Sequence, residues 1–349
     1  MRIPRQLSAA ILVCAFGVVA SCAGAQADPV EDFYKGKTVT LVASGGAGGP
    51  IDLAARQVAK FLPRYIPGNP VVVVRNMPGG GHVLASNFLF NNAPKDGTYI
   101  GGVVNSVPLH QVIDGRGVRY NASKFLWLGS TGNANLMTVA WHTSGFKTID
   151  EVFKRELITG ATGVGSGTYV YTNAMNIVLG TKFKMVLGYA SSAEVDLAIE
   201  RGEVQARGGF SLTGIKQERP HWLAEKKVNV LLQVGAEREA EYPDVPLMHE
   251  LARTEEQRQI LTLISSPPLL GRPFFTPPDV AAERFAALRK AFAAVVKDED
   301  FIAEGRKLNL DLNPISGEKI AEIVNDTVNA PSDVVAKAKA ALDTPAGAN

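Results

Sequence analysis

Short, continuous apolar runs alternate along this chain with segments whose apolar residues recur every three or four positions. Residues 38–44 (TVTLVAS) form such a run, and residues 51–62 place Ile51, Ala55 and Val58 on one face of a helix. The first pattern is typical of a buried strand and the second of an amphipathic helix. The pattern thus predicts a strand, a glycine-rich loop and a helix in direct succession.

The same alternation continues in two blocks. In the first block it predicts strands at 71–75 and 99–105 and a helix at 82–90. In the second block it predicts strands at 136–141, 157–161, 184–189 and 204–207, and helices from 148, at 168–179 and at 193–201. Strands that alternate with helices at this spacing indicate an α/β fold with largely parallel sheets.

Two similar blocks predict two lobes, because a chain of this length exceeds the usual single core. We expect one lobe to comprise residues 28–130 together with 235–349, and the other to comprise residues 131–234. Expected strands at 125–130 and 228–234 flank the second block and are candidates for hinge crossings. The C-terminal helices predicted at 278–296, 300–308 and 317–329 need a sheet to pack on, and we assign them to the first lobe.

Glycine-rich loops separate strands from helices at 45–50, 78–81 and 163–167. Backbone N–H groups and the positive end of the helix dipole bind anions at such places, and ligands of open α/β sheets bind at the carboxyl ends of the strands. The Walker A, G-x-G-x-x-G and nucleophile-elbow signatures all fail at these loops. The loops therefore predict an anion site, and tight turns between strand and helix are the alternative explanation of the glycines.

The candidate ligand-binding residues belong to the loops that follow the strands. They are Ser44, Gly45, Gly46, Ala47, Gly48, Gly49, Gly79, Gly80, Gly81, His82, Asn105, Ser106, Gly165, Ser166, Gly167, Thr168, Tyr189, Arg207 and Phe210. We expect Asp52 to cap or pin its own loop. Arg207 pairs either with a ligand carboxylate or with an acidic side chain of its own lobe. Tyr189 either contacts a ligand or packs between the lobes.

The first 27 residues have the pattern of a secretory signal peptide. Arg2 and Arg5 precede an apolar run of about a dozen residues, which is shorter than the roughly 20 that span a bilayer, and Ala25-Gln26-Ala27 follows as a cleavage site. We therefore expect an exported, periplasmic protein cleaved after Ala27. The run Val19-Ala20-Ser21-Cys22 leaves open a lipid anchor on Cys22 instead.

The composition that remains after such cleavage excludes several classes of function. Cys14 and Cys22 are the only cysteines, so the mature chain would have no disulfide and no thiolate site. Without Arg2 and Arg5, the 36 basic residues fall to the same number as the 34 acidic ones. A neutral chain does not predict binding to nucleic acid. The histidines are too scattered for a metal signature, so we expect no metal and no cofactor.

An ordered set of short motifs resembles the Bug-type extracytoplasmic solute receptors of tripartite tricarboxylate transporters. The set covers most of the mature chain: Tyr34-Lys35-Gly36-Lys37, Gly48-Gly49-Pro50-Ile51-Asp52, 70–81 (PVVVVRNMPGGG), Ala93-Pro94-Lys95-Asp96-Gly97, the loop at 163–168, Tyr189 and Tyr242-Pro243-Asp244-Val245-Pro246. The chain differs from the family pattern at Pro50, which stands for a glycine, and at 207–210, where an Asp-containing loop is usual.

The resemblance implies a type II periplasmic-binding-protein fold that closes on a small carboxylate, aliphatic or aromatic, and delivers it to membrane permease subunits. It also implies that the loops named above hold the ligand. We expect a monomer without enzymatic activity. Two alternatives stay open: a receptor that signals to a two-component kinase, and an exported hydrolase or isomerase that uses His82.

Overall fold

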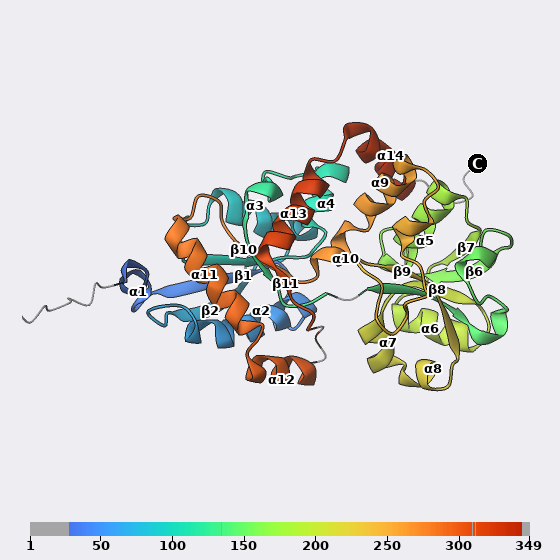
Figure 1. Cartoon of the computed structure of the whole chain (residues 1–349), viewed down its shortest axis with the longest axis horizontal. Coiled ribbons are helices and arrows are strands. Elements are labelled where there is room, and N and C mark those ends of the chain that lie inside the picture. Colours follow the sequence, from blue (N-terminus) through green and yellow to red (C-terminus); the bar gives the residue numbers. More distant parts are fainter. Residues whose placement is uncertain (1–27, 134, 309, 311, 344–349) are drawn as a thin grey trace, which may run out of the picture.

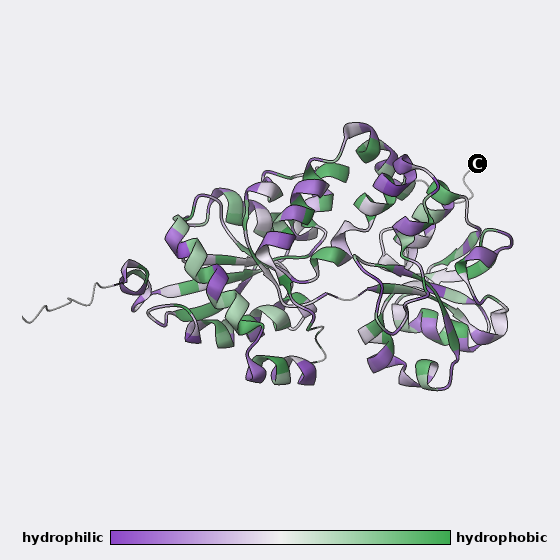
Figure 2. Cartoon of the chain, viewed as in Figure 1, coloured by the Kyte–Doolittle hydropathy of each residue, from purple (hydrophilic) through white to green (hydrophobic). Residues whose placement is uncertain are grey.

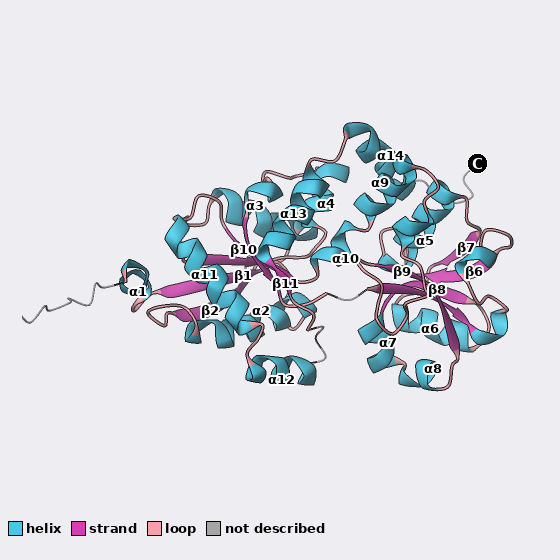
Figure 3. Ribbon diagram, in the orientation of Figure 1, coloured by secondary structure: helices cyan, strands magenta, loops and turns pink. Residues whose placement is uncertain are grey.

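A computed structural model describes residues 28–133, 135–308, 310 and 312–343. The chain builds two α/β lobes that lie side by side, each around its own sheet (Figures 1 and 3). Hydrophobic residues follow the strands of both sheets (Figure 2). The predicted α/β fold with two lobes is thus confirmed. The predicted signal peptide and both cysteines fall outside the described residues.

The first sheet has six strands in the order β11-β4-β10-β3-β1-β2. These are β1 (Thr38–Ala43), β2 (Val71–Asn76), β3 (Tyr99–Gly102), β4 (Leu126–Ser130), β10 (Pro273–Thr276) and β11 (Ile315–Ser316). β1 pairs in parallel with β2 and β3, whereas β10 runs antiparallel between β3 and β4. Apolar residues of α1 (Pro29–Tyr34), α2 (Pro50–Phe61), α11 (Ala282–Val295) and α12 (Glu299–Lys307) form one core, and those of α3 (Val83–Asn91), α4 (Val107–Ile113) and α13 (Gly317–Val328) form another.

The second sheet has five strands in the order β7-β6-β8-β5-β9. These are β5 (Leu136–Trp141), β6 (Leu157–Ala161), β7 (Phe183–Leu187), β8 (Ala206–Ser211) and β9 (Val228–Val234). β6 pairs in parallel with β7 and β8, and β5 is antiparallel to β8 and β9. One core includes α5 (Gly167–Leu179), α9 (Glu255–Ile264) and α14 (Ser332–Asp343); the other includes α6 (Ser192–Glu200), α7 (Leu212–Glu218) and α8 (Pro220–Ala224).

The helices after residue 235 divide between the lobes. The three that we predicted and assigned to the first lobe pack there, whereas α9 and α14 pack on the second lobe. Leu261 of α9 and Val334 of α14 are buried in the second lobe's core, and the Asn173 side chain of α5 donates to the carbonyl of Ala341 at 3.0 Å. α11, α12 and α13 do pack on the first lobe. We propose the division of the chain at residues 130 and 235 for the remaining elements. The helices α9 and α14 follow residue 235 but pack in the second lobe.

Several local elements also differ from those expected. The helix expected from residue 148 is a single 3₁₀ turn, Ile149–Glu151. The sheets are mixed because β10 and β5 are antiparallel to the strands beside them. β10 was not predicted, since only four residues between Arg272 and Pro277 carry no periodic pattern. In the described part of the chain, no helix is long and apolar enough to cross a membrane.

Two chain segments that connect the lobes are held together by backbone hydrogen bonds. Residues 131–135 lead from β4 to β5, and residues 235–272 lead from β9 back to β10. Where they meet, the N–H of Thr131 donates to the carbonyl of Arg272 at 3.3 Å, and the N–H of Arg272 donates to the carbonyl of Gly132 at 3.1 Å. Gly271 has a φ of +59°, and a Cβ there would lie 2.1 Å from the Gly132 oxygen. The contact between the crossings therefore requires glycine at position 271.

We predict that Gly271→Ala destabilises the fold more than Gly180→Ala. Both glycines have positive φ, but a Cβ at Gly180 would meet no atom within 4 Å. The left-handed backbone costs of the order of 1–3 kcal/mol in either variant, and only Gly271→Ala adds the clash with Gly132. Urea unfolding followed by circular dichroism measures both free energies. Equal losses in the two variants would contradict the close contact between the crossings.

Candidate functional site

The carboxyl ends of the parallel strands lie at one edge of each sheet, and each edge adjoins the crossings. In the first lobe, the register pairs Ala43 with Gly102, Gly102 with Phe274 and Phe274 with Gly129, so that β1 and β3 end level with the crossing after Ser130. In the second lobe, Leu136 pairs with Ser211 and Val234, which puts the end of β8 beside the same crossing. The loops that follow these strands in the two lobes therefore adjoin the same junction.

The loop between β1 and α2 is fixed by a buried carboxylate. Asp52 is 1% exposed and accepts hydrogen bonds from the Gly48 N–H at 2.8 Å, from Asn76 Nδ2 at 2.8 Å and from Arg56 Nε at 2.9 Å. Asn76 also donates to the carbonyl of Gly45 at 3.0 Å. The hydrogen bond from Arg56, together with those from Gly48 and Asn76, lowers the pKa of Asp52 to about 2. Asp52 therefore pins its own loop, as the sequence indicated.

Ser44 and His82 join two of the predicted loops. The Ser44 Oγ lies 3.0 Å from His82 Nδ1 and accepts a hydrogen bond from the Val104 N–H at 3.2 Å. Ser44 is fully buried, whereas His82 is half-buried and has a left-handed backbone, with φ +74°, at the N-cap of α3. The loops after β1, β2 and β3 thus meet around one serine hydroxyl.

In the second lobe, the loop between β6 and α5 packs against the end of β8. Ser166 Oγ donates to the carbonyl of Gly163 at 2.7 Å, so it accepts the hydrogen bond from Thr168 Oγ1 at 2.7 Å. Gly209 has a φ of +66°, and a Cβ there would lie 2.2 Å from the Gly167 oxygen. This contact with the N-terminus of α5 requires a glycine, so part of the glycine signal in the second lobe is structural.

Arg207 and Phe210 contact each other within the second lobe. Arg207 is 5% exposed, and its guanidinium pairs with the fully buried carboxylate of Asp196 at 2.5 Å. The same guanidinium lies 3.8 Å from the ring centroid of Phe210, which is itself buried in the core of α6, α7 and α8. The alternative of an ion pair within the lobe is the one that the structure contains, because a buried carboxylate needs a cation beside it.

Tyr189 follows β7 and is half-buried. Its ring packs on the second lobe's core next to Gly160 of β6, and burial raises the pKa of its hydroxyl. This packing lies within one lobe and not between the lobes. In contact with a ligand, the ring would have to use its exposed part.

Two cavities lie at the junction of the lobes. The larger has about 330 Å³ and is lined by residues of both lobes and of the crossings, among them Asn105 of the first lobe and Leu136, Tyr171 and Ser211 of the second. The smaller has about 150 Å³ and lies against β3 and α2. Asn105, Gly271 and Arg272 line both. Of the predicted site residues, Asn105 therefore lies at a cavity between the lobes. Ser211, the last residue of β8, lines the larger cavity from the second lobe, and residues 207–210 belong to the same strand.

Sequence reasoning missed Arg272, Tyr171 and the two prolines, Pro267 and Pro268, that line the larger cavity. Tyr171 lies on α5, where the apolar pattern indicates only a residue of the hydrophobic core. The other three precede β10, in a segment without a motif that indicates binding. A cavity of this volume between two lobes falls in the size range of small-ligand sites. Among the described residues, no group of three or more His, Cys, Asp or Glu is arranged to hold a metal ion.

Comparison with solved structures shows the fold. A TctC solute binding protein from Polaromonas superposes with a TM-score of 0.68 at 16% identity, over 89% of this chain and 99% of that one. The periplasmic binding protein BugD gives 0.55 at 18% identity, over 87% and 98%. MatC from Rhodopseudomonas palustris, with bound malate, gives 0.53 at 19% identity, over 86% and 99%. The resemblance to Bug-type receptors is confirmed for the fold.

The sequence comparisons add no further relative. No family model matches the chain, and no curated protein matches it.

We predict that Asp52→Asn removes a pH-dependent part of the stability. Because the pKa of Asp52 falls from 3.8 to about 2 on folding, its contribution is complete above about pH 5 and is lost as the pH drops toward 2. The expected loss in the variant at pH 7 is of the order of 1–2 kcal/mol. Urea unfolding of both proteins between pH 7 and pH 2.5 measures the difference. A gap that does not narrow toward acid pH would contradict the role of the carboxylate.

Proposed function

We propose that this protein is an exported, periplasmic receptor that captures a small carboxylate between its lobes and delivers it to a tripartite-tricarboxylate-type membrane transporter. The observation that carries the proposal is the cavity of about 330 Å³ whose wall is shared by both lobes and by their crossings. A cavity of this kind changes shape when the lobes rotate, which is how two-lobed receptors trap a ligand. The signal-peptide pattern of residues 1–27 supports export.

A carboxylate is the ligand class that the loops favour. The loops before α2, α3 and α5 offer backbone N–H groups at helix N-termini, where an anion is stabilised. Their charged neighbours Asp52 and Arg207 are already engaged within their own lobes. MatC, a protein of the same fold, has malate bound. We therefore infer that backbone dipoles hold one carboxylate of the ligand, and that the polar side chains Asn105 and Ser211 contact the remainder.

Capture requires that each lobe stays rigid while the crossings bend. Asp52 and Asn76 fix the first-lobe loop before any ligand arrives, so little ordering entropy is lost on binding. The contact of Gly209 with Gly167 fixes the second-lobe loop in the same way. Closure around the ligand would exclude water and strengthen the N–H hydrogen bonds to the anion.

Two other functions are compatible with the same fold. A receptor that signals to a membrane kinase would use the same closure, and the partner alone separates the two roles. An exported hydrolase or isomerase would need His82 as a base, yet its Nδ1 already contacts Ser44 Oγ and the Ser44 carbonyl, each at 3.0 Å. We favour a receptor that does no covalent chemistry.

We predict that one or more aliphatic or aromatic carboxylates raise the melting temperature of the purified protein, and that Asn105→Ala weakens the binding. Bound at about 100 times its Kd, a ligand adds about 2.7 kcal/mol to the stability. The loss of an amide contact to a charged group should lower the affinity about tenfold or more. Thermal shift identifies the ligand, and isothermal titration calorimetry gives the affinity of both proteins.

The matched control is Asn92→Ala, because Asn92 is exposed at the end of α3 and lies away from both cavities. It should bind as tightly as the unchanged protein. Recovery of the carboxylate chemically unaltered supports a receptor. A shift by amines, sugars or nucleotides, with none by carboxylates, would overturn the proposed ligand class.

A further inference from the structure

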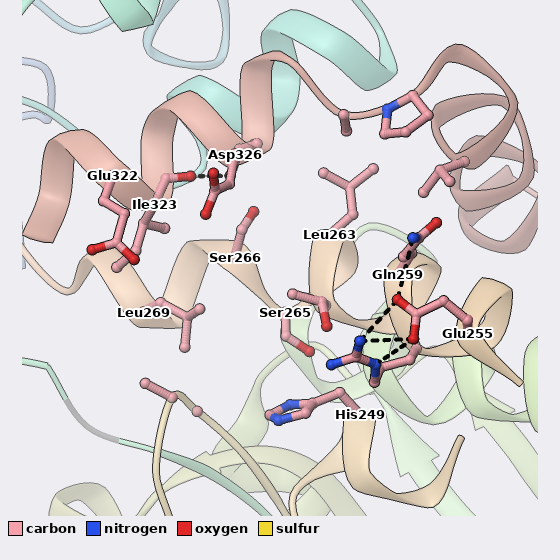
Figure 4. A pocket seen from close by; sticks show the side chains of 18 of the residues that line it. His249, Glu255, Gln259, Leu263, Ser265, Ser266, Leu269, Glu322, Ile323 and Asp326 are labelled. Carbon is pink, nitrogen blue, oxygen red and sulfur yellow. Dashed lines mark hydrogen bonds and ion pairs between the residues drawn. The ribbon is translucent and has the colours of Figure 1, made fainter. Parts of the chain in front are cut away.

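A third cavity, of about 450 Å³, lies away from the predicted loops, among helices that come from both lobes. Its walls are formed by α9 and α14, which pack in the second lobe's core, and by α13, which packs on the first lobe (Figure 4). Gly235 and Ala236 of one crossing line it, and so do Ala330 and Pro331, which connect α13 to α14. We call it the rear cavity.

The rear cavity combines an apolar surface with two unused polar groups. Leu263, Leu269 and Ile323 supply apolar surface. Ser266 is 4% exposed, and no described residue forms a hydrogen bond with its Oγ. Figure 4 shows this hydroxyl on the side of α10 (Ser266–Leu270) that faces α13, the helix that carries Asp326. A buried hydroxyl without a partner costs free energy, and a ligand donor at this place would remove that cost.

Asp326 lines this cavity with an exposed carboxylate. The other charged residues that line it form ion pairs with one another: Arg258 with Glu255 at 2.7 Å, and Lys319 with Glu322 at 2.8 Å. Within the described part of the chain, no cation pairs with Asp326. This carboxylate and the Ser266 hydroxyl line the same cavity, and both accept hydrogen bonds, so together they favour a cation that carries N–H donors.

We propose that the rear cavity is a second ligand site, which takes a small organic ammonium ion with an apolar body. The ammonium group would donate to the Asp326 carboxylate and to Ser266 Oγ, and the apolar body would cover Leu263, Leu269 and Ile323. This ligand class has the opposite charge to the carboxylate proposed for the site between the lobes.

The two sites share one wall. In α10, Ser266 and Leu269 line the rear cavity, whereas Pro267 and Pro268 line the cavity between the lobes. The helices α9, α13 and α14 bridge the lobes on one side, and α2 and α7 remain apart on the other (Figure 1). A rotation that brings α2 toward α7 would draw α13 away from α9. A ligand whose ammonium group is held by Asp326 of α13, and whose apolar body covers Leu263 of α9, therefore resists this separation and holds the lobes open. It weakens carboxylate binding, a step that rests on the proposed function.

The test is calorimetric titration of the purified protein with hexylammonium, with hexanol as the neutral analogue of equal length. Hexylammonium should bind at least about tenfold more tightly than hexanol, because charged hydrogen bonds are the stronger ones. Asp326→Asn should reduce hexylammonium binding to the level of hexanol. The matched control, Asp150→Asn, changes an exposed carboxylate of the 3₁₀ turn Ile149–Glu151 and should leave binding unchanged.

Ser266→Ala should also weaken hexylammonium binding, by a smaller factor than Asp326→Asn does, because it removes a neutral acceptor. Equal binding of hexylammonium and hexanol, or an Asp326→Asn variant that binds like the unchanged protein, would overturn the site. These titrations need no carboxylate, so they decide the rear site even if the proposed function fails. Where a carboxylate is found, linkage predicts that saturating hexylammonium lowers its affinity at least about threefold in the original protein. In Asp326→Asn, the same concentration of hexylammonium should leave the carboxylate affinity unchanged. An unchanged affinity in the original protein would refute the coupling alone.

Discussion

The parallel pairing of strands within each sheet is the constraint on which the rest of the structure depends. Because β1 runs parallel to β2 and β3, and β6 parallel to β7 and β8, each lobe collects its strand-to-helix loops at one edge. The crossings leave and enter at those same edges, as the pairing of Leu136 with Ser211 shows. A shared cavity at the junction follows from this topology without any special side chain.

Charge near these loops stabilises the protein itself. Asp52 holds the first loop through three hydrogen bonds, and Arg207 neutralises Asp196 inside the second lobe. Buried charges need partners, and both groups find theirs within a lobe. What remains for an anionic ligand is the set of backbone dipoles at the N-termini of α2, α3 and α5, where the N-cap residue makes no side-chain capping hydrogen bond. Such a site depends on loop geometry, and the glycine at 209, which packs against the Gly167 carbonyl, keeps that geometry in the second lobe.

The helices after residue 235 connect the lobes by more contacts than the two crossings alone would make, because some pack in one lobe and some in the other. The chain passes from α9 in the second lobe to β10 in the first, and then from α13 back to α14. Each lobe is thus completed by segments distant in sequence, and any rotation of the lobes must rearrange the contacts among α9, α10 and α13. Closure and the packing of the C-terminal helices are consequently linked mechanically.

The sequence alone determined the alternation of strands and helices, the two-lobed α/β class and the positions of the glycine loops, because these follow from local periodicity and turn chemistry. It also predicted that Asp52 pins its own loop, since a carboxylate at the start of a helix has backbone donors within reach. Tertiary structure alone decided between the two roles of Arg207, because its partner Asp196 lies on a helix that periodicity cannot orient. It likewise placed β10 between β3 and β4 and α14 on the second lobe, since a short strand and a surface helix gain their positions from long-range packing.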